Sequence, residues 1–338
     1  MKYTAFLFAF LAASSLFSQI EIKGTQGKPC YEKAAQKMRS KYIDYDCGKI
    51  AGVLDCNEKL EYEEQANMFF SKGSGQPYTG QCETCHPNGL LERRIKFTNG
   101  REDGIDTTYY YSGCPMVVRE HTLGLENGRW RYYYDSTQQL AWERNYYRGI
   151  KQGVHVFFDN KGDTTVLENY ANDLLNGVKK VYFTKNKVER IIYYTNGVFN
   201  GPYITYNMDG KKIQELNYKM GKKDGVLTFY YDDGTLLRTE NWTIGVKNGE
   251  FKTLYYNGSL QSIENYKKGI KEGIFEERYN NQKVKRRAFY KKGELIEEHI
   301  FDEYGKETYT FGAQPYPETE DDAVPEFPSN TKKEKKKK

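Results

Sequence analysis

The stretch CETCH, residues 82–86, carries the residue types and the spacing that could do chemistry in this chain. Cys-x-x-Cys-His is the attachment pattern of c-type haem, in which two thioethers and an axial histidine hold the macrocycle. Cys82, Cys85 and His86, together with Cys114, would also suit zinc, although their spacing is not that of a standard zinc finger. A Cys-x-x-Cys pair can also be a redox centre where a helix start lowers a thiol pKa. The choice depends on the elements that position the motif.

The cysteines favour a fourth chemistry, structural disulfides. All six lie in roughly the first third of the chain, at Cys30, Cys47, Cys56, Cys82, Cys85 and Cys114. An even number of cysteines in an exported protein predicts disulfides, but six cysteines allow fifteen connectivities and the sequence does not choose among them. Disulfides are the favoured hypothesis and no cofactor is expected. Haem or metal binding through Cys82, Cys85 and His86 remains the alternative.

The N-terminus predicts the compartment. Residues 1–19 hold Lys2, an apolar run and then small residues, which is typical of a secretory signal peptide and too short to span a membrane. No later segment is apolar enough to cross a bilayer. The protein is therefore expected in the periplasm or outside the cell, without an integral membrane segment after signal cleavage.

Composition favours strands and argues against a nucleic-acid partner. Aromatic residues make up 15% of the chain, with 31 tyrosines, while the mean hydropathy is -0.85. Tyrosine favours strands and tolerates half-burial, so an all-β protein with wet faces is expected. The net charge of +5 equals the charge of the last eight residues, which hold six lysines and one glutamate. A near-neutral body with a basic tip does not resemble a phosphate-binding surface.

Most of the chain repeats. The pattern aromatic-x-x-Gly-x-x-x-Gly recurs, as in "YKMGKKDG" and "WTIGVKNG", with a step of 24 residues and a single step of 25. A period of this length is the signature of a repeat architecture. The closing glycines, which are the predicted turn glycines of the repeat, are Gly80, Gly104, Gly128, Gly153, Gly177, Gly201, Gly225, Gly249 and Gly273.

Each repeat predicts one β-hairpin. About seven strand-like residues follow the closing glycine, then a turn such as "MDG" or "DDG", then a second strand. Asp-Gly and Asn-Gly accept positive φ and close tight hairpins. A single hairpin is marginal alone, whereas a stack buries each inner face against its neighbours. The predicted fold is all-β: an elongated antiparallel β-meander of about nine 24-residue hairpin repeats with a small Cys-containing N-terminal cap.

Two kinds of residue recur within the repeat. Asparagines precede most loops, at Asn145, Asn169, Asn217, Asn241 and Asn265, and are interpreted as a ladder that bonds turn backbone. Aromatic residues recur two and six places after the closing glycine, where regular pairing would put them on one packing face. Aromatic residues at the fifth place would face the other way. Tyr206 and Tyr230, with Trp130 from the second place, are the candidate binding aromatics.

The register places the reactive motif on a strand. Gly80 aligns with Gly104, so Cys82 takes the second place, Cys85 the fifth and His86 the sixth, just before the "PNG" turn. A hairpin in an open meander offers neither the deep pocket that haem needs nor the helix start that activates a redox thiol. The register therefore favours disulfides.

"YKMGKKDGVLTFYYDDGTLL" and "WTIGVKNGEFKTLYYNGSL" resemble the MORN-repeat variant of bacterial YwqK-like proteins, often labelled antitoxin components of toxin–antitoxin systems. The resemblance covers roughly residues 76 to 312. It implies a β-repeat scaffold for protein or membrane contacts and no set of catalytic residues. The apparent export signal and the clustered cysteines depart from a cytosolic antitoxin.

These observations define four segments: a signal peptide at 1–19, a cap at 20–66, a repeat array at 67–312 and a disordered tail at 313–338 that is acidic and then basic. No catalytic motif is found and no catalytic residue is expected. We expect an exported, non-enzymatic scaffold that binds a protein partner in the cell envelope or outside the cell. An antitoxin-like or immunity-like inhibitor and the haem or metal redox protein are the alternatives.

Overall fold

A computed structural model describes residues 53–312 of the chain. The predicted signal peptide, Cys30, Cys47 and the tail at 313–338 lie outside the described residues. In the described part, the strands are assigned to a 27-stranded sheet and a separate two-stranded sheet, and the one helix, α2, has four residues. This confirms the predicted all-β meander of hairpin repeats. The described residues contain no helix long and apolar enough to cross a membrane.

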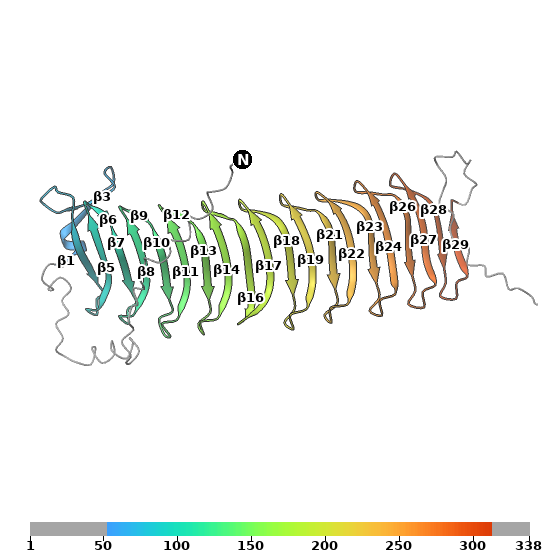
Figure 1. Ribbon diagram of the computed structural model, residues 1–338, viewed down its shortest axis with the longest axis horizontal. Coiled ribbons are helices and arrows are strands. Elements are labelled where there is room, and N and C mark those ends of the chain that lie inside the picture. Colours follow the sequence, from blue (N-terminus) through green and yellow to red (C-terminus); the bar gives the residue numbers. More distant parts are fainter. Residues whose placement is uncertain (1–52, 313–338) are drawn as a thin grey trace, which may run out of the picture. The chain divides into compact units, whose positions relative to one another are not determined.

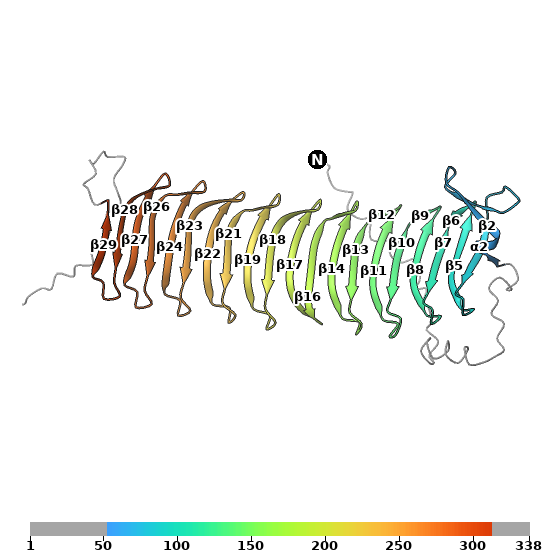
Figure 2. The ribbon, with the colours of Figure 1, turned by 180° about the vertical axis from the view of Figure 1, so that it is seen from behind.

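The chain divides into two compact units, residues 1–163 and 164–338, which are described separately. In each unit, strands that follow one another in sequence lie side by side (Figures 1 and 2). The elements of unit 1 are β1 (Leu54–Asp55), α2 (Cys56–Lys59), β2 (Leu60–Glu63), β3 (Met68–Ser71), β4 (Gly80–Cys85), β5 (Leu91–Thr98), β6 (Arg101–Glu102), β7 (Gly104–Tyr109), β8 (Pro115–Thr122), β9 (Leu125–Glu126), β10 (Gly128–Tyr133), β11 (Leu140–Tyr147), β12 (Ile150–Lys151) and β13 (Gly153–Phe158).

Unit 2 contains only strands in its described part. They are β14 (Thr164–Ala171), β15 (Leu174–Leu175), β16 (Gly177–Thr184), β17 (Lys187–Thr195), β18 (Val198–Tyr206), β19 (Lys212–Lys219), β20 (Lys222–Lys223), β21 (Gly225–Tyr230), β22 (Leu236–Thr243), β23 (Val246–Leu254), β24 (Leu260–Lys267), β25 (Ile270–Lys271), β26 (Gly273–Arg278), β27 (Val284–Lys291), β28 (Glu294–Phe301) and β29 (Glu307–Phe311).

The closing glycines stand where strands begin or bend. Seven of the nine open a strand, while Gly201 and Gly249 lie inside β18 and β23. All nine have positive φ, from +69° to +153°, a region that side chains other than glycine rarely adopt. At Gly249 an added Cβ would also lie 3.1 Å from the Cβ of Asn241 on the neighbouring strand. Conformation and close approach together therefore require glycine at this place.

Strand pairing is regular until just before each hairpin turn. In β21 and β22, Leu227 pairs with Glu240, but the register shifts between Phe229 and Tyr230. The same shift occurs between the fourth and fifth places of most hairpins, including Thr84 and Cys85. The shift interrupts the strict alternation assumed for places two and six, and β21 ends at the fifth place. Second-place Phe275 and sixth-place Tyr255 and Tyr279 nevertheless line one groove.

The buried side chains form a ridge along one face of the sheet. In unit 2, Leu227, Phe251 and Phe275, all at the second place, are 1–5% exposed. Phe251 packs edge-on against Trp242 and Tyr266, with ring centroids 5.8 and 5.0 Å apart. Aromatic packing within one sheet layer therefore supplies the core of this unit.

The first repeat of unit 1 has additional cover. β1 runs parallel to β4, in contrast to the expected antiparallel pairing. The hairpin β2–β3 and helix α2 complete a cluster of buried side chains: Leu60, Tyr78, Cys82, Ile95 and Phe97. The expected boundary between residues 66 and 67 falls within the turn of the β2–β3 hairpin, and the repeat strands begin at Gly80.

Candidate functional site

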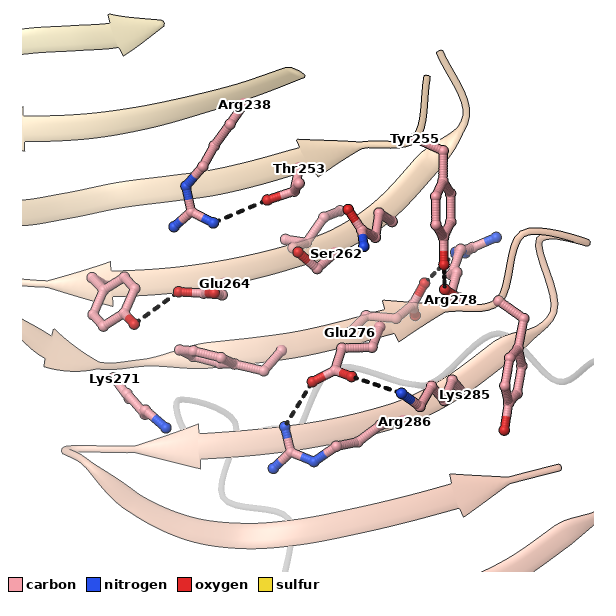
Figure 3. A pocket seen from close by; sticks show the side chains of 16 residues that line it. Arg238, Thr253, Tyr255, Ser262, Glu264, Lys271, Glu276, Arg278, Lys285 and Arg286 are labelled. Carbon is pink, nitrogen blue, oxygen red and sulfur yellow. Dashed lines mark hydrogen bonds and ion pairs between the residues drawn. The ribbon is translucent and has the colours of Figure 1, made fainter. Parts of the chain in front are cut away.

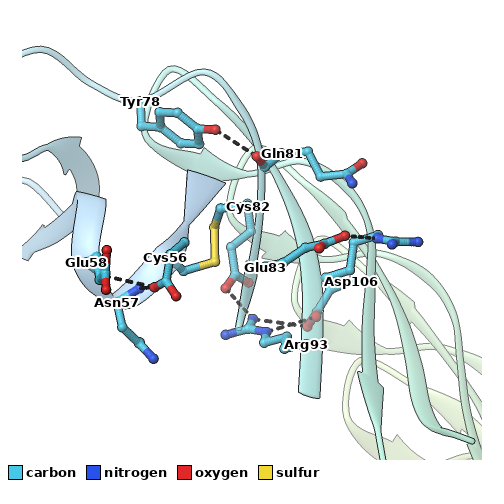
Figure 4. The surroundings of a disulfide bond; sticks show 12 residues. Cys56, Asn57, Glu58, Tyr78, Gln81, Cys82, Glu83, Arg93 and Asp106 are labelled. Atoms are coloured by element: carbon cyan, nitrogen blue, oxygen red, sulfur yellow. Dashed lines mark hydrogen bonds and ion pairs between the residues drawn. A yellow bond between two sulfur atoms is a disulfide. The ribbon is translucent and has the colours of Figure 1, made fainter. Parts of the chain in front are cut away.

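The motif CETCH lies on β4 and the start of its turn. Cys82 is fully buried and forms a disulfide with Cys56 of α2, as Figure 4 shows. Cys85 is also disulfide-bonded. The Nε2 atom of His86 lies 3.1 Å from the carbonyl oxygen of Tyr109. Because a carbonyl oxygen only accepts, Nε2 is the nitrogen that carries the proton and donates.

The two cysteine sulfurs and the histidine that haem or zinc would need already have other bonding partners in this structure. Both sulfurs of the motif are in disulfides, so neither is a thiolate ready to bind metal or form a thioether. His86 donates its Nε2 proton to a neighbouring hairpin. Within residues 53–312, no group of three or more histidine, cysteine or carboxylate side chains is arranged to hold a metal ion. Cys114 is fully buried, on the next hairpin.

His86 takes a place that tyrosine holds in other repeats. The hydroxyl of a sixth-place tyrosine donates to the fifth-place carbonyl of the following hairpin, at 2.5–3.0 Å. This occurs for Tyr110 to Tyr133, Tyr134 to Phe158, Tyr231 to Leu254, Tyr255 to Arg278 and Tyr279 to Phe301. The sixth-place row is therefore a ladder that joins neighbouring hairpins, and the imidazole of His86 supplies the same bond.

The recurrent asparagines have a similar role. Asn169, Asn241 and Asn265 each donate through Nδ2 to the carbonyl of the residue after the next closing glycine, at 2.5 Å, and Asn145 makes the equivalent bond to Val154. The backbone carbonyl of Asn217 accepts from the amide of Asp224 at 2.9 Å. These bonds agree with the structural interpretation of the asparagines.

A second polar ladder was not predicted from the sequence. The residue before a closing glycine accepts a hydrogen bond from a backbone amide twenty or twenty-one residues later, at 2.6–3.4 Å. The acceptors are Asp103, Asn127, Asn176, Asn200, Asp224, Asn248 and Glu272. The signal is present as "EDG", "ENG", "LNG" and "KNG". These polar residues adjoin the closing glycines, whose turn chemistry is sufficient to explain the pattern.

The candidate binding aromatics are not grouped on one exposed surface. Trp130 belongs to the packing ridge of unit 1, where its ring lies 4.8 Å from Tyr146 and 5.4 Å from His121. Its indole Nε1 donates to the carbonyl of Glu120 at 3.1 Å. Tyr206 and Tyr230 are half-buried at the ends of β18 and β21. The three candidate binding aromatics are therefore half-buried rings.

Unit 2 has a groove of about 520 Å³ on the ridge face of β22 to β27. Arg238, Ser262 and Glu264 are among the side chains that line it (Figure 3). The aromatic side consists of Tyr266 and Phe275, and the Nζ of Lys271 lies 5.2 Å from the Phe275 ring centroid. Cations held above rings in this way are attracted by the negative face of the ring.

Several polar groups of the groove are hydrogen-bonded to neighbouring side chains. Arg238 donates to Glu240 at 2.7 Å and to Thr253 at 3.0 Å. The hydroxyl of Tyr266 donates to Glu264 at 2.9 Å, and burial together with this bond raises the pKa of Tyr266 to about 12. The groove is thus a hydrogen-bonded polar surface beside an aromatic one. Its lining contains no histidine or cysteine.

An exposed row of aliphatic side chains follows the loops that contain the first glycines. We call this border of each unit the loop edge; the short strands β6, β9 and β12 mark it in unit 1 (Figure 1). In six loops, the residue directly after the first glycine of the aromatic-x-x-Gly-x-x-x-Gly pattern, or after Asp173 in its place, is aliphatic and 39–50% exposed. These residues, the aliphatic row, are Leu125 and Ile150 in unit 1 and Leu174, Val198, Val246 and Ile270 in unit 2.

The aliphatic row was also not predicted, although its signal is simple. The loops read "GLENG", "GIKQG", "GVFNG", "GVKNG" and "GIKEG", with an aliphatic residue directly after the first glycine. Each side chain packs partly on the next loop: a Cβ added to Gly269 would lie 3.2 Å from Cγ1 of Val246. The rest of the side chain faces solvent. Lys222 takes the corresponding place between Val198 and Val246.

The loop edge of unit 2 is also basic. Six lysines there are exposed: Lys219, Lys222, Lys267, Lys268, Lys271 and Lys292. Of the carboxylates at this edge, Asp224 and Glu272 accept backbone hydrogen bonds from Ile244 and Lys292, while Asp173 and Glu294 are exposed. The edge therefore combines aliphatic contact area with an excess of positive charge.

Comparisons with known proteins leave the family open. No family model and no curated protein matches the chain. A solved structure of the Tc holotoxin pore of Photorhabdus luminescens shows a low similarity, with 13% sequence identity and a TM-score of 0.17. The match covers 74% of this chain and 15% of that one, so this chain spans a small part of its length. A TM-score this low carries no argument about fold or function.

Proposed function

We propose that this chain is a non-enzymatic β-repeat scaffold that binds a protein partner along the loop edge of unit 2. The observation that carries the proposal is the exposed aliphatic row, Leu174, Val198, Val246 and Ile270. Contiguous exposed apolar side chains rimmed by polar residues mark interaction surfaces. The other recurrent residues form hydrogen-bond ladders or the packing ridge. The aliphatic row is therefore the repeated feature whose apolar surface is available to a partner.

The charge of the loop edge indicates the chemistry of that partner. Exposed lysines flank the row on both sides of Val246 and Ile270, as with Lys222, Lys267 and Lys268. Complementary charge steers association and suppresses wrong partners. The fitting partner is therefore a protein segment that presents acidic side chains beside apolar ones. The Cys56–Cys82 disulfide supports an oxidising compartment, and hence a partner in the cell envelope or outside the cell.

Site-specific photocrosslinking in the source cell tests this proposal. A photoreactive residue is placed at Val246 on the loop edge or, as a matched control, at Tyr256, which is 63% exposed in a hairpin turn of the same unit. We expect one protein adduct of defined mass from Val246 and none from Tyr256. No adduct at Val246, or the same adducts at both positions, would contradict the proposal.

The crosslinked partner is then purified and its binding measured. Replacing both Val246 and Ile270 by serine removes apolar contact area without changing charge. Burial of such side chains is worth about 1.5–3 kcal/mol each, so the dissociation constant should rise on the order of tenfold or more. The matched control is Tyr256→Ser, which should leave the constant unchanged.

A further inference from the structure

The last strand of unit 2 has an open edge. β29 pairs with β28 along one side, and no strand within residues 53–312 pairs with its other side. All five of its residues are exposed, including Tyr309 at 49% and Phe311 at 46%. Figures 1 and 2 show β29 as the outermost arrow of unit 2. A strand in this position presents unpaired N–H and C=O groups that can template another strand.

This edge has few of the usual protections. The sequence from Glu307 to Phe311 contains neither lysine nor proline, the residues that most often block edge pairing. The one register shift in the β28–β29 pair lies between Ile300 and Phe301, next to the turn. From Tyr309 to Phe311 the pairing with β28 is regular, so the outer side of this stretch has strand geometry available for a further strand.

The residue order of β29 fits a second copy of the same strand. If two copies pair antiparallel about Tyr309, the two tyrosines face each other, Thr308 faces Thr310, and Glu307 faces Phe311. Aromatic and threonine cross-strand pairs are favourable, and no like charges are opposed. Parallel pairing in register would place Glu307 against Glu307. The antiparallel arrangement is a two-fold, isologous contact, which closes after two chains.

We propose that two copies of this chain join through β29, paired antiparallel about Tyr309. The contact covers the exposed rings of Tyr309 and Phe311 and satisfies the open backbone groups of both strands. It is separate from the aliphatic row of unit 2, whose residues are the first residues of β15, β18, β23 and β25.

Charge substitution at the two-fold position tests the proposal on the full chain. Tyr309→Lys and Tyr309→Glu each place like charges against each other across the axis, whereas a mixture of the two variants pairs opposite charges. We expect the parent to be dimeric by light scattering and sedimentation. Each variant alone should dissociate with a constant raised on the order of tenfold or more, and the 1:1 mixture should recover a heterodimer.

The controls distinguish loss of this contact from loss of the fold. Tyr304→Lys, in the preceding turn at 77% exposure, should leave the dimer intact. Hydrogen exchange of β26 and β27 should match the parent in every variant, which shows that the fold is kept. A monomeric parent overturns the proposal, and so does a dimer that both Tyr309 variants retain. A monomeric chain that dimerises only after residues 313–338 are removed also overturns it, because the chain's own C-terminal segment would then occupy the edge.

Discussion

At the first strands of unit 1 the sheet is covered by additional elements, whereas at the last strands of unit 2 the edge of the sheet is exposed. In unit 1 the capped end, residues 54–98, adds a parallel strand, a helix turn, a hairpin and the Cys56–Cys82 disulfide around the first repeat. In unit 2 the open end, residues 294–312, finishes with one exposed five-residue strand. Cover of this kind protects an edge from pairing with another chain, whereas an edge left bare remains available for it.

The two ends also differ in how their cores are covered. Phe97 of the capped end is 2% exposed and packs against Phe69 of β3, at 4.8 Å between ring centroids, as well as Tyr78. Near the open end, Phe275 is 5% exposed and packs against Tyr266 and Tyr290 of its own sheet. Phe97 is thus packed between the repeat sheet and the β2–β3 hairpin, whereas Phe275 is packed only by side chains of its own sheet.

The largest expected effect comes from truncating these two rings. Phe97→Ala should lower the free energy of unfolding of unit 1 by about 4–5 kcal/mol, because a cavity between two covered faces collapses poorly. Phe275→Ala should lower that of unit 2 by about 3 kcal/mol, since neighbours on a single layer can relax into the space. Denaturant-dependent hydrogen exchange of peptides from each unit measures both values. Equal losses, or a larger loss for Phe275→Ala, would show that cover at the capped end adds nothing.

The next effect isolates the covalent part of the cap. Cys56→Ser opens a disulfide that joins residues 26 apart, which should destabilise unit 1 by about 3 kcal/mol. The loss should appear in peptides of β4 and β5, where Cys82 pairs with Ile95. Peptides of β28 and β29 are the internal control and should exchange at the parent rate. Unchanged exchange in β4 would mean that apolar packing alone holds the cap.

Much of this architecture could be predicted from the sequence because it depends on local signals. The positive φ of glycines such as Gly225 and Gly249 is a local requirement, so their spacing predicts the hairpins and the order of the strands. The haem-like motif could be assigned to a strand for the same reason. The register shift between Phe229 and Tyr230 could not be predicted in this way, because it depends on the pairing of two strands.

The proposed interaction surface could be recognised only in the structure. The sequence suggested that fifth-place tyrosines such as Tyr206 and Tyr230 face away from the packing ridge, yet both are half-buried. The sixth-place tyrosines Tyr231 and Tyr255 donate to carbonyls of the next hairpin. Such bonds join residues 23 apart and depend on how hairpins stack, which no local pattern specifies. The aliphatic residue that follows the first glycine in most loops is visible in the sequence but resembles strand sequence, and only its exposure distinguishes Val246 from a core position.

The smallest expected effect concerns two histidines whose pKa values are shifted in opposite directions. They are His121 of unit 1 and His299 near the open end. Burial lowers the pKa of His121 below its usual value, against the opposing influence of Glu102, 3.3 Å away. Burial alone would also lower the pKa of His299, but hydrogen bonds to Glu297 and Glu307 outweigh it and raise that pKa. A lowered folded-state pKa stabilises the fold above the unfolded value of about 6.5, and a raised one stabilises it below.

The two regions should therefore respond to pH in opposite directions. As the pH falls below about 6.5, the unfolded state takes up a proton that folded His121 resists, so the stability of unit 1 decreases. As the pH rises above about 6.5 through the raised pKa of His299, the open end loses the stability that its charged imidazole supplies through Glu297 and Glu307. Hydrogen exchange at about pH 5.5 and about pH 8, corrected for intrinsic rates, measures both regions in one sample. His121→Gln and His299→Gln should each flatten the response of their own region only. If the stability of both regions changed with pH in the same direction, the opposite pKa shifts of the two histidines would be refuted. The two ends would then differ only in how their cores are covered.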